Sequence, residues 1–219
     1  MEPLLTFAEA RVLGCLLEKE ATTPDAYPLT MAGVITACNQ TSNRDPVVAF
    51  EESVVDEALA GLRRKKLASM LHLAGSRAPK YKHLVSEFFP GLHQPERALL
   101  TVLLLRGTQS AAELKIRTDR LHPFPDPETV EISLRRLMEW QEGPLVALHP
   151  PGGGRRTATY SPLLFTPNAS AQAPETLSPL ATATTATTAD WRTTMEMEME
   201  ALRTRLSALE SALGLTSTP

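Results

Sequence analysis

The chain has 219 residues, of which 42% are hydrophobic and 21% are charged, with a formal net charge of −3. This composition excludes a wholly disordered chain, and no apolar run approaches the length that spans a membrane. The N-terminus lacks the pattern of a secretory signal, and two cysteines, Cys15 and Cys38, are too few for a disulfide framework or a zinc site, so we expect a cytoplasmic protein with reduced thiols.

Residues 1–90 predict three helices followed by a β-hairpin. The spacing from Thr6 to Glu9 is that of a capping box, and Thr30 can cap a second, shorter helix after a loop that holds two prolines. Apolar residues recur at helical intervals through both of these helices and through a third expected helix at about residues 51–66. A tip with Gly and Pro then separates two short strand-like runs. The helices and strands are expected at about residues 6–20, 30–38, 51–66, 67–73 and 80–85.

Residues 91–165 repeat this order of elements. Pro95 suits the first turn of a helix and Gly107 suits its end. Ser110 to Glu113 has the spacing of a second capping box, and Asp126 is a strong start for the third helix of this half. Two strands then flank a tip that contains three glycines and two arginines. These strands are expected at residues 145–148 and 157–160.

Three helices and a hairpin in this order are typical of a winged helix, the helix-turn-helix variant with an appended β-wing. The sequence therefore predicts a mainly α-helical fold of the α+β class, with small β-hairpins. We expect two tandem winged-helix domains, at residues 1–90 and 91–165.

A linker and a last helix are expected after the second hairpin. Ala, Thr, Pro and Ser dominate residues 166–189, which predicts a disordered linker. Residues 190–214 predict an amphipathic helix whose apolar side chains alternate spacings of four and three, the pattern of a coiled coil. These side chains are Met195, Met199, Leu202, Leu206, Leu209 and Leu213. The stripe is short, so it either joins two chains in a dimer or docks onto the body of its own chain.

Two stretches resemble the YceH family of bacterial proteins. The first is EARVLGCLLEKEATTPDAYPLT at residues 9–30, and the second is ACNQTSNRDPV at residues 37–47. The resemblance covers about residues 4–165 and leaves the linker and the last helix outside. It implies tandem winged helices, and it supplies no established catalytic or ligand-binding residues to carry over.

The candidate DNA contacts lie where a winged helix meets DNA, on or before the third helix and on the wing. Arg and Lys bind phosphates, and Arg, Asn and Gln read base edges. The first domain offers Asn39, Gln40, Asn43, Arg44, Arg63, Arg64, Lys65, Lys66, Arg77, Lys80 and Lys82. The second domain offers Arg135, Arg136, Arg155 and Arg156.

Two observations keep a structural interpretation open beside the DNA interpretation. Acidic residues crowd the start of each expected third helix, and bases follow at its end, as the helix dipole favours. The polar loop at residues 39–46 can equally satisfy backbone groups in turns, and Arg44 can pair with Asp45 inside it. The net charge does not decide, because residues 1–165 are electrically balanced and residues 166–219 carry the whole excess of acid.

No residue pattern points to an enzyme or to a cofactor. The five histidines are scattered without metal-ligand spacing, both cysteines lie on apolar helix faces, and the glycine run at 152–154 lacks the strand-to-helix context of a phosphate loop. The leading hypothesis is a non-catalytic DNA-binding protein, a transcriptional regulator that acts as a dimer. The alternative is an adaptor that binds an unidentified protein partner through winged-helix scaffolds without binding DNA.

Overall fold

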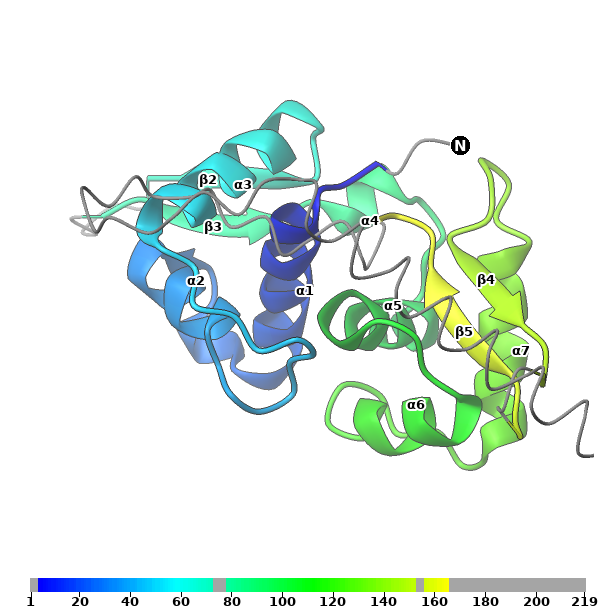
Figure 1. The fold of residues 1–219 in the computed structure, drawn as a ribbon. Helices are drawn as coiled ribbons and strands as arrows, with labels where there is room; N and C mark the ends of the chain where they lie inside the picture. The colour runs from blue at the N-terminus through cyan, green and yellow to red at the C-terminus, as the bar shows by residue number, and fades with distance from the viewer. Residues whose placement is uncertain (1–3, 73–77, 153–155, 166–219) are drawn as a thin grey trace, which may run out of the picture. The chain divides into compact units, whose positions relative to one another are not determined.

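The computed structural model describes residues 4–72, 78–152 and 156–165, all within one compact unit at residues 1–173. The predicted linker at 166–189 and the predicted helix at 190–214 lie outside the described residues. The elements in chain order are α1 (Phe7–Thr22), the 3-10 helix η1 (Pro24–Ala26), β1 (Leu29–Thr30), α2 (Met31–Cys38), α3 (Glu52–Arg64), β2 (Ala68–Leu71), β3 (Lys80–His83), α4 (Val85–Phe88), α5 (Gln94–Arg106), α6 (Ala111–Thr118), α7 (Pro127–Met138), β4 (Val146–His149) and β5 (Thr159–Pro162). The fold is therefore of the α+β class (Figure 1).

Side-chain caps begin the helices where the sequence predicts them. Thr6 accepts a hydrogen bond from the backbone of Glu9, whose carboxylate in turn accepts one from the backbone of Thr6. The same reciprocal pair forms between Ser110 and Glu113 at the start of α6. Thr30 caps α2. Asp126 caps α7, because its carboxylate accepts a hydrogen bond from the backbone N–H of Thr129. These caps satisfy amide groups that the first turn of a helix leaves without a partner.

The first sheet has one strand more than the predicted hairpin. β2 and β3 pair antiparallel, and the two-residue strand β1 adds to the other edge of β3 through the pair Leu29 and Tyr81. The third helix ends at Arg64, earlier than the expected residue 66. Lys66 has a φ of +59° in the left-handed region, and the backbone of Leu67 donates back to Leu62, which closes the helix end.

The second half repeats the helical order and ends in a two-stranded sheet. β4 and β5 pair antiparallel as predicted, with Leu148 opposite Tyr160. Gly107 ends α5 with a φ of +69°, a conformation that strains residues with a side chain. Gln109 and Tyr160 then form an isolated bridge that joins the loop after α5 to β5.

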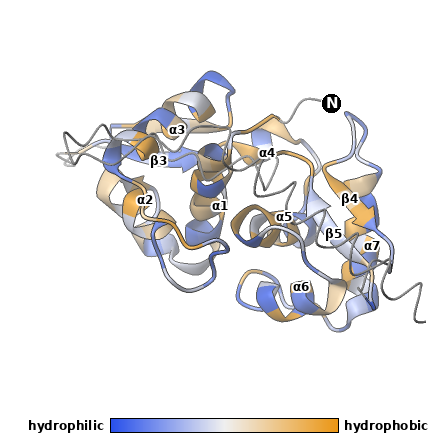
Figure 2. Cartoon of the chain, in the orientation of Figure 1, coloured by the Kyte–Doolittle hydropathy of each residue, from blue (hydrophilic) through white to orange (hydrophobic). Residues whose placement is uncertain are grey.

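The two halves share one hydrophobic core, with α1 packed against α5 at its centre (Figure 1). Figure 2 shows α5 as a largely hydrophobic helix, and all its residues from Ala98 to Leu105 are buried. Gly14 permits the close approach, because a Cβ at that position would lie 3.2 Å from the Cβ of Leu104. The predicted domains at 1–90 and 91–165 are thus joined into one compact body. Within the described residues, each helix is too short or too polar to cross a bilayer.

Candidate functional site

The polar loop between α2 and α3 is tied to the interior at its first residue. The side-chain amide of Asn39 donates to the carbonyl of Phe50 at 2.9 Å, and its oxygen accepts from the backbone N–H of Phe50 at 2.7 Å. This pair of bonds fixes the distance between the end of α2 and the approach to α3. Asn39, a predicted DNA contact, therefore has a structural partner for each face of its amide.

Arg44 is buried and its donors are used inside the protein. Its guanidinium forms a bidentate pair with Glu18, at 3.1 Å and 2.6 Å, and its Nε donates to the carbonyl of Ala37. The remaining N–H groups donate to the carbonyl of Asn43 and to the side chain of Gln40, so all five donors have partners. Burial disfavours the charged form, but the hydrogen bonds and charge of Glu18 outweigh it and raise the pKa of Arg44.

This geometry corrects the expectation that Arg44 faces a phosphate or a base. The Arg44 side chain has 0% exposure, so a DNA contact requires the loop to open. Its acidic partner is also different from the expected Asp45, because Glu18 on α1 supplies both oxygens. Gln40 belongs to the same network, since its oxygen accepts from Arg44 and from Lys19.

Arg11 is a second buried arginine, and it is not among the site residues predicted from the sequence. Its guanidinium donates to the carbonyls of Cys38 and Pro46, at 3.3 Å and 2.7 Å, and lies over the ring of Phe7. Burial lowers the pKa of Arg11 below its ordinary value. A basic residue between Ala10 and Val12, inside an apolar helix segment, was the sequence signal for this role. Arg11 and Arg44 together fix the polar loop from the inside.

A groove between the two halves gathers basic side chains that the sequence analysis missed. We call it the basic groove; it has a volume of about 340 Å³ and carries Lys19, Arg106, Arg117 and Arg120. Its remaining lining is Glu18, Thr22, Thr23, Gln40, Ser42, Asn43, Val102, Leu105, Ile116 and Leu121. Glu18, its one acidic lining residue, already neutralises Arg44. The groove thus presents an excess of positive charge at a concave surface.

Arg106 is a basic lining residue that the polar loop holds in place. Its Nη1 donates to the side-chain oxygen of Asn43 at 3.1 Å, and its buried Nε has no hydrogen-bond partner among the described residues. Burial, followed by the positive charge of Arg117, lowers the pKa of Arg106 below its ordinary value. Arg117 itself pairs with Glu113 one turn earlier, at 3.3 Å. Arg120 is exposed.

The basic end of α3 divides into one internal and three outward residues. Lys65 pairs with Glu9, the glutamate of the first capping box, and is thereby committed to the packing of α3 on α1. Arg63, Arg64 and Lys66 are exposed. The two arginines line a shallow hollow of about 500 Å³ with Ala60, Ala68, Ser69 and Met70.

The remaining candidates lie on the hairpins and on α7. Lys80 and Lys82 alternate along β3 with the buried Tyr81 and His83, so they occupy the opposite face of that strand. Arg135 is exposed, and Arg136 pairs with the buried Glu96 of α5. Arg156 is exposed beside the second hairpin tip. Arg77 and Arg155 fall outside the described residues.

Acidic side chains are exposed at the starts of both third helices, as the sequence indicates. Glu52, Asp56 and Glu57 lie on the outer face of α3, and Glu128 and Glu131 lie on that of α7. The predicted contacts therefore come from several elements. They lie on the polar loop, the basic end of α3, the hairpins and α7.

Three further titratable groups are buried in structural roles. His83 accepts from the backbone of Val85 through Nδ1 at 3.2 Å, and its Nε2 lies 2.8 Å from Glu20. Burial lowers the pKa of His83. Cys15 and Cys38 are both fully buried and free, and the hydrogen bond with Cys15, together with burial, raises the pKa of the Cys38 thiol.

Comparison with known proteins identifies the family. A family model described as "Protein of unknown function, DUF480" matches residues 5–155. A UPF0502 protein of Pelobacter propionicus is 51% identical over 164 residues, which are 75% of this chain and 74% of that protein. A UPF0502 protein of Geobacter sulfurreducens is 48% identical over 167 residues, again 75% and 74% of the two chains.

A third relative extends the similarity past the body. The UPF0502 protein of Shewanella sp. strain ANA-3 is 40% identical over 213 residues, which are 96% of this chain and 93% of that protein. The similarity is therefore wider than the range of about 4–165 expected from the two quoted stretches. With a family model over more than half of its length and these relatives, the chain belongs to the DUF480 family of UPF0502 proteins.

Proposed function

We propose that the chain is a cytoplasmic, non-enzymatic DNA-binding protein built from two winged-helix modules, with the architecture of a transcriptional regulator. The repeated order of three helices and an antiparallel hairpin supports this assignment of the modules. α3 and α7 take the place of the recognition helices, since each precedes a hairpin and buries one apolar face. The hairpins β2–β3 and β4–β5 take the place of the wings.

The observation that carries the proposal is the excess of positive charge in the basic groove. Phosphate neutralisation supplies much of the affinity of a protein for DNA, and concave basic surfaces concentrate an attractive field. Lys19 shares the carboxylate of Glu18 with the buried Arg44, at 3.7 Å and 2.6 Å. Arg106 and Arg120 form no ion pair with any carboxylate among the described residues, so the bases of the groove outnumber its acids. Arg106 lines the groove and adds a guanidinium charge that attracts phosphate oxygens.

The acids on the two third helices favour one mode of approach over another. Glu52 and Asp56 on α3, and Glu128 on α7, repel phosphates from the N-terminal turns. The C-terminal ends carry Arg63, Arg64, Lys66 and Arg135, which are exposed and attract phosphates. We therefore propose that backbone contacts dominate and come from the helix ends, the basic groove and the wing residues Lys80, Lys82 and Arg156.

Fluorescence anisotropy with labelled duplex fragments of genomic DNA tests this proposal. Arg120→Ala removes an exposed charge from the basic groove and is expected to weaken DNA binding by about threefold to tenfold. Arg97→Ala is the matched control, because it removes one charge from α5 outside the groove lining and leaves the affinity unchanged. Absence of binding at about 50 mM salt would refute the DNA proposal.

The same acids support a second candidate function, a protein–protein adaptor. Ile116 and Ile132 are 76% and 49% exposed, and Ile132 lies beside Glu128 and Glu131 on α7. An exposed apolar side chain with charged residues of both signs around it fits the rim-and-core pattern of a protein interface. A protein that fails to bind DNA but retains a partner from extract, and loses it on Ile132→Asp substitution, would favour this candidate.

We infer self-association from the coiled-coil pattern at residues 190–214, which the sequence alone supports. Core substitutions Leu202→Asp and Leu209→Asp, made together, are expected to shift the molar mass in light scattering from dimer to monomer. Thr204→Asp is the control, because it falls at an outward position of the same heptads. An unchanged mass for the double variant would refute the inference.

A further inference from the structure

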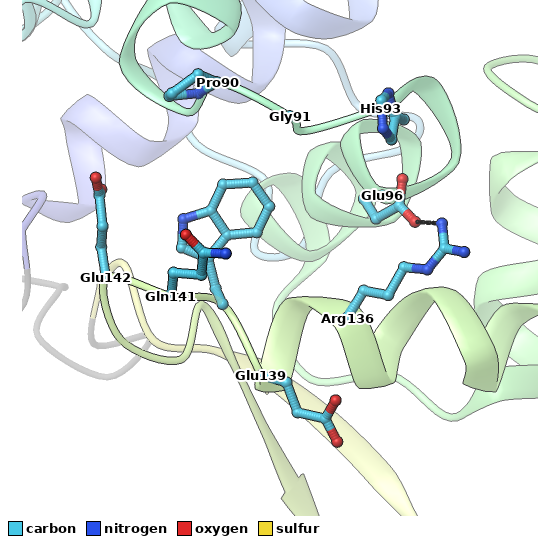
Figure 3. Close-up of a pocket in the computed structure, with 9 residues that line it drawn as sticks. Pro90, Gly91, His93, Glu96, Arg136, Glu139, Gln141 and Glu142 are labelled. Atoms are coloured by element: carbon cyan, nitrogen blue, oxygen red, sulfur yellow. Dashed lines mark hydrogen bonds and ion pairs between the residues drawn. The ribbon is translucent and has the colours of Figure 1, made fainter.

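A second cavity lies between α5, α7 and two loops, and most of its charged lining residues are acidic, whereas those of the basic groove are mostly basic. It has a volume of about 380 Å³, within the range of small-molecule sites. Its lining is Pro90, Gly91, His93, Glu96, Arg136, Glu139, Trp140, Gln141 and Glu142 (Figure 3). The loop before α5 forms one wall, and the end of α7 with the loop after it forms the other. Three of these residues are acidic and one is a formal cation.

Glu96 is the buried charged group of this cavity. It is 2% exposed, and its Oε1 accepts from Nη1 of Arg136 at 3.2 Å, as Figure 3 shows. The other oxygen, Oε2, is buried and has no hydrogen-bond partner among the described residues. A buried carboxylate oxygen without a donor is costly, because it has lost water and gained nothing in return. The site therefore lacks one hydrogen-bond donor.

Arg136 can turn away from Glu96 into the solvent. Its side chain is 64% exposed although it reaches a carboxylate that is almost wholly buried. An arginine that is 64% exposed stays largely hydrated within the pair and becomes fully hydrated when it turns outward. The buried carboxylate of Glu96 then needs another positive charge beside it. A cation from solution can therefore replace the guanidinium of Arg136 at Glu96.

Trp140 supplies an aromatic wall to the same cavity. It is half-buried and held edge to face against Phe89, with ring centroids 6.1 Å apart and an interplanar angle of 82°. Indole faces attract organic cations more strongly than other aromatic rings do. Glu139 and Glu142 stand at the exposed rim and add negative charge around it.

We propose that this cavity binds a small organic cation that carries an ammonium or guanidinium group. The cation binds the carboxylate of Glu96 in place of Arg136, packs against Trp140, and is attracted by the rim carboxylates. The proposal does not depend on DNA binding, since it uses a separate and oppositely charged cavity.

Tryptophan fluorescence and calorimetry test this binding on the full-length chain. The Trp191→Phe background leaves Trp140 as the single tryptophan, so its emission reports the cavity alone. Agmatine and spermidine represent free amines, and N-acetylarginine amide represents an arginine side chain of a protein. Saturable changes with the two amines alone assign a free ligand, and saturation by the third probe as well assigns side-chain recognition. 1,4-Butanediol and magnesium chloride at matched ionic strength are expected to give no saturable change.

Two substitutions at the ion pair give opposite expected effects. Glu96→Gln keeps the shape of the side chain, removes its charge, and is expected to weaken cation binding by about tenfold or more. Arg136→Ala removes the internal competitor and is expected to tighten it severalfold. Glu128→Gln is the control, because this carboxylate lies at the opposite end of α7 and does not line the cavity.

No saturable binding of any cationic probe, or affinities that are the same in the parent chain and in both variants, would refute the proposal. If thermal unfolding shows that Glu96→Gln fails to fold, the tightening by Arg136→Ala decides alone. Weaker binding in that variant would show that Arg136 belongs to the site and is not a competitor, which also contradicts the proposal.

Discussion

Arg44 and Glu18 form a buried, bidentate ion pair, with distances of 3.1 Å and 2.6 Å, that joins the polar loop to α1. The pair gives a structural reason for the most distinctive stretch of the sequence, at residues 37–47. Arg44 also bonds to two carbonyls and to Gln40, so the loop folds around its guanidinium. The side chain of Arg44 therefore anchors the otherwise exposed loop to the body of the protein. The loop brings Ser42 and Asn43 to the wall of the basic groove.

Loss of Arg44 is expected to destabilise the protein strongly. Arg44→Ala removes the bidentate partner of Glu18 and leaves the carbonyls of Ala37 and Asn43 without the donor that Arg44 supplies, which costs about 3–5 kcal/mol of unfolding free energy. Urea unfolding measures this quantity. The exposed Arg64→Ala is the control and is expected to change stability by less than about 0.5 kcal/mol. Equal stabilities for the two variants would show that the pair does not hold the loop.

The close packing of α1 on α5 predicts opposite results for two glycines. A Cβ at Gly14 would lie 2.9 Å from Cδ2 of Leu105 and 3.2 Å from the Cβ of Leu104. Gly14→Val is therefore expected to overpack the core and lower the unfolding free energy by about 2 kcal/mol. At Gly33 the nearest atom is 3.5 Å away, so Gly33→Ala is expected to be neutral or to stabilise α2 by up to about 1 kcal/mol. Tolerance of Val at position 14 in thermal unfolding would contradict the shared core.

His83 is expected to make the stability depend on pH below neutrality. Burial lowers its pKa in the folded state, against the opposing effect of Glu20, so the folded protein binds fewer protons than the unfolded chain. The contribution of neutral His83 is present in full above about pH 6.5, the ordinary value, and is lost as the pH falls through the folded pKa. Arg97 also lowers the pKa, whereas Glu87 raises it.

Comparison of melting temperatures between about pH 8 and pH 5 measures this effect. His83→Gln is expected to flatten the decline, because the side chain can still accept a hydrogen bond but does not titrate. His72→Gln serves as the control at an exposed histidine and is expected to leave the decline unchanged. A decline of the same size in His83→Gln would place the titrating group elsewhere.

Local signals predict the secondary structure well because they act over a few residues. Thr6, Thr30 and Ser110 cap helices through bonds to residues three positions away, and the sequence displays both partners. Local signals cannot predict β1, because its two residues become a strand only by pairing with Lys80 and Tyr81 in a distant segment. The left-handed backbone conformation of Lys66 likewise cannot be predicted from the residue type, because lysine seldom adopts it.

The candidate site was harder to predict because burial of a charge depends on distant partners. The sequence allows Arg44 to contact DNA or to pair with Asp45, and only the fold brings Glu18, 26 residues earlier, beside it. Arg106 and Arg117 stand in the last turns of α5 and α6, where basic residues are common and indicate no binding site. Only the contact between the two halves places them in one groove with Lys19. The sequence therefore predicts which side chains can bind a phosphate, whereas the packing of α1 on α5 decides which of them stand together.

The salt dependence of DNA affinity tests the central claim, contact between the basic groove and the DNA backbone, most directly. A plot of log affinity against log salt concentration is expected to be less steep for Arg120→Ala than for the parent chain, by about 0.9 for one lost phosphate contact. Arg97→Ala is expected to keep the parent slope. A slope for Arg120→Ala that equals that of the parent chain would contradict phosphate binding in the groove.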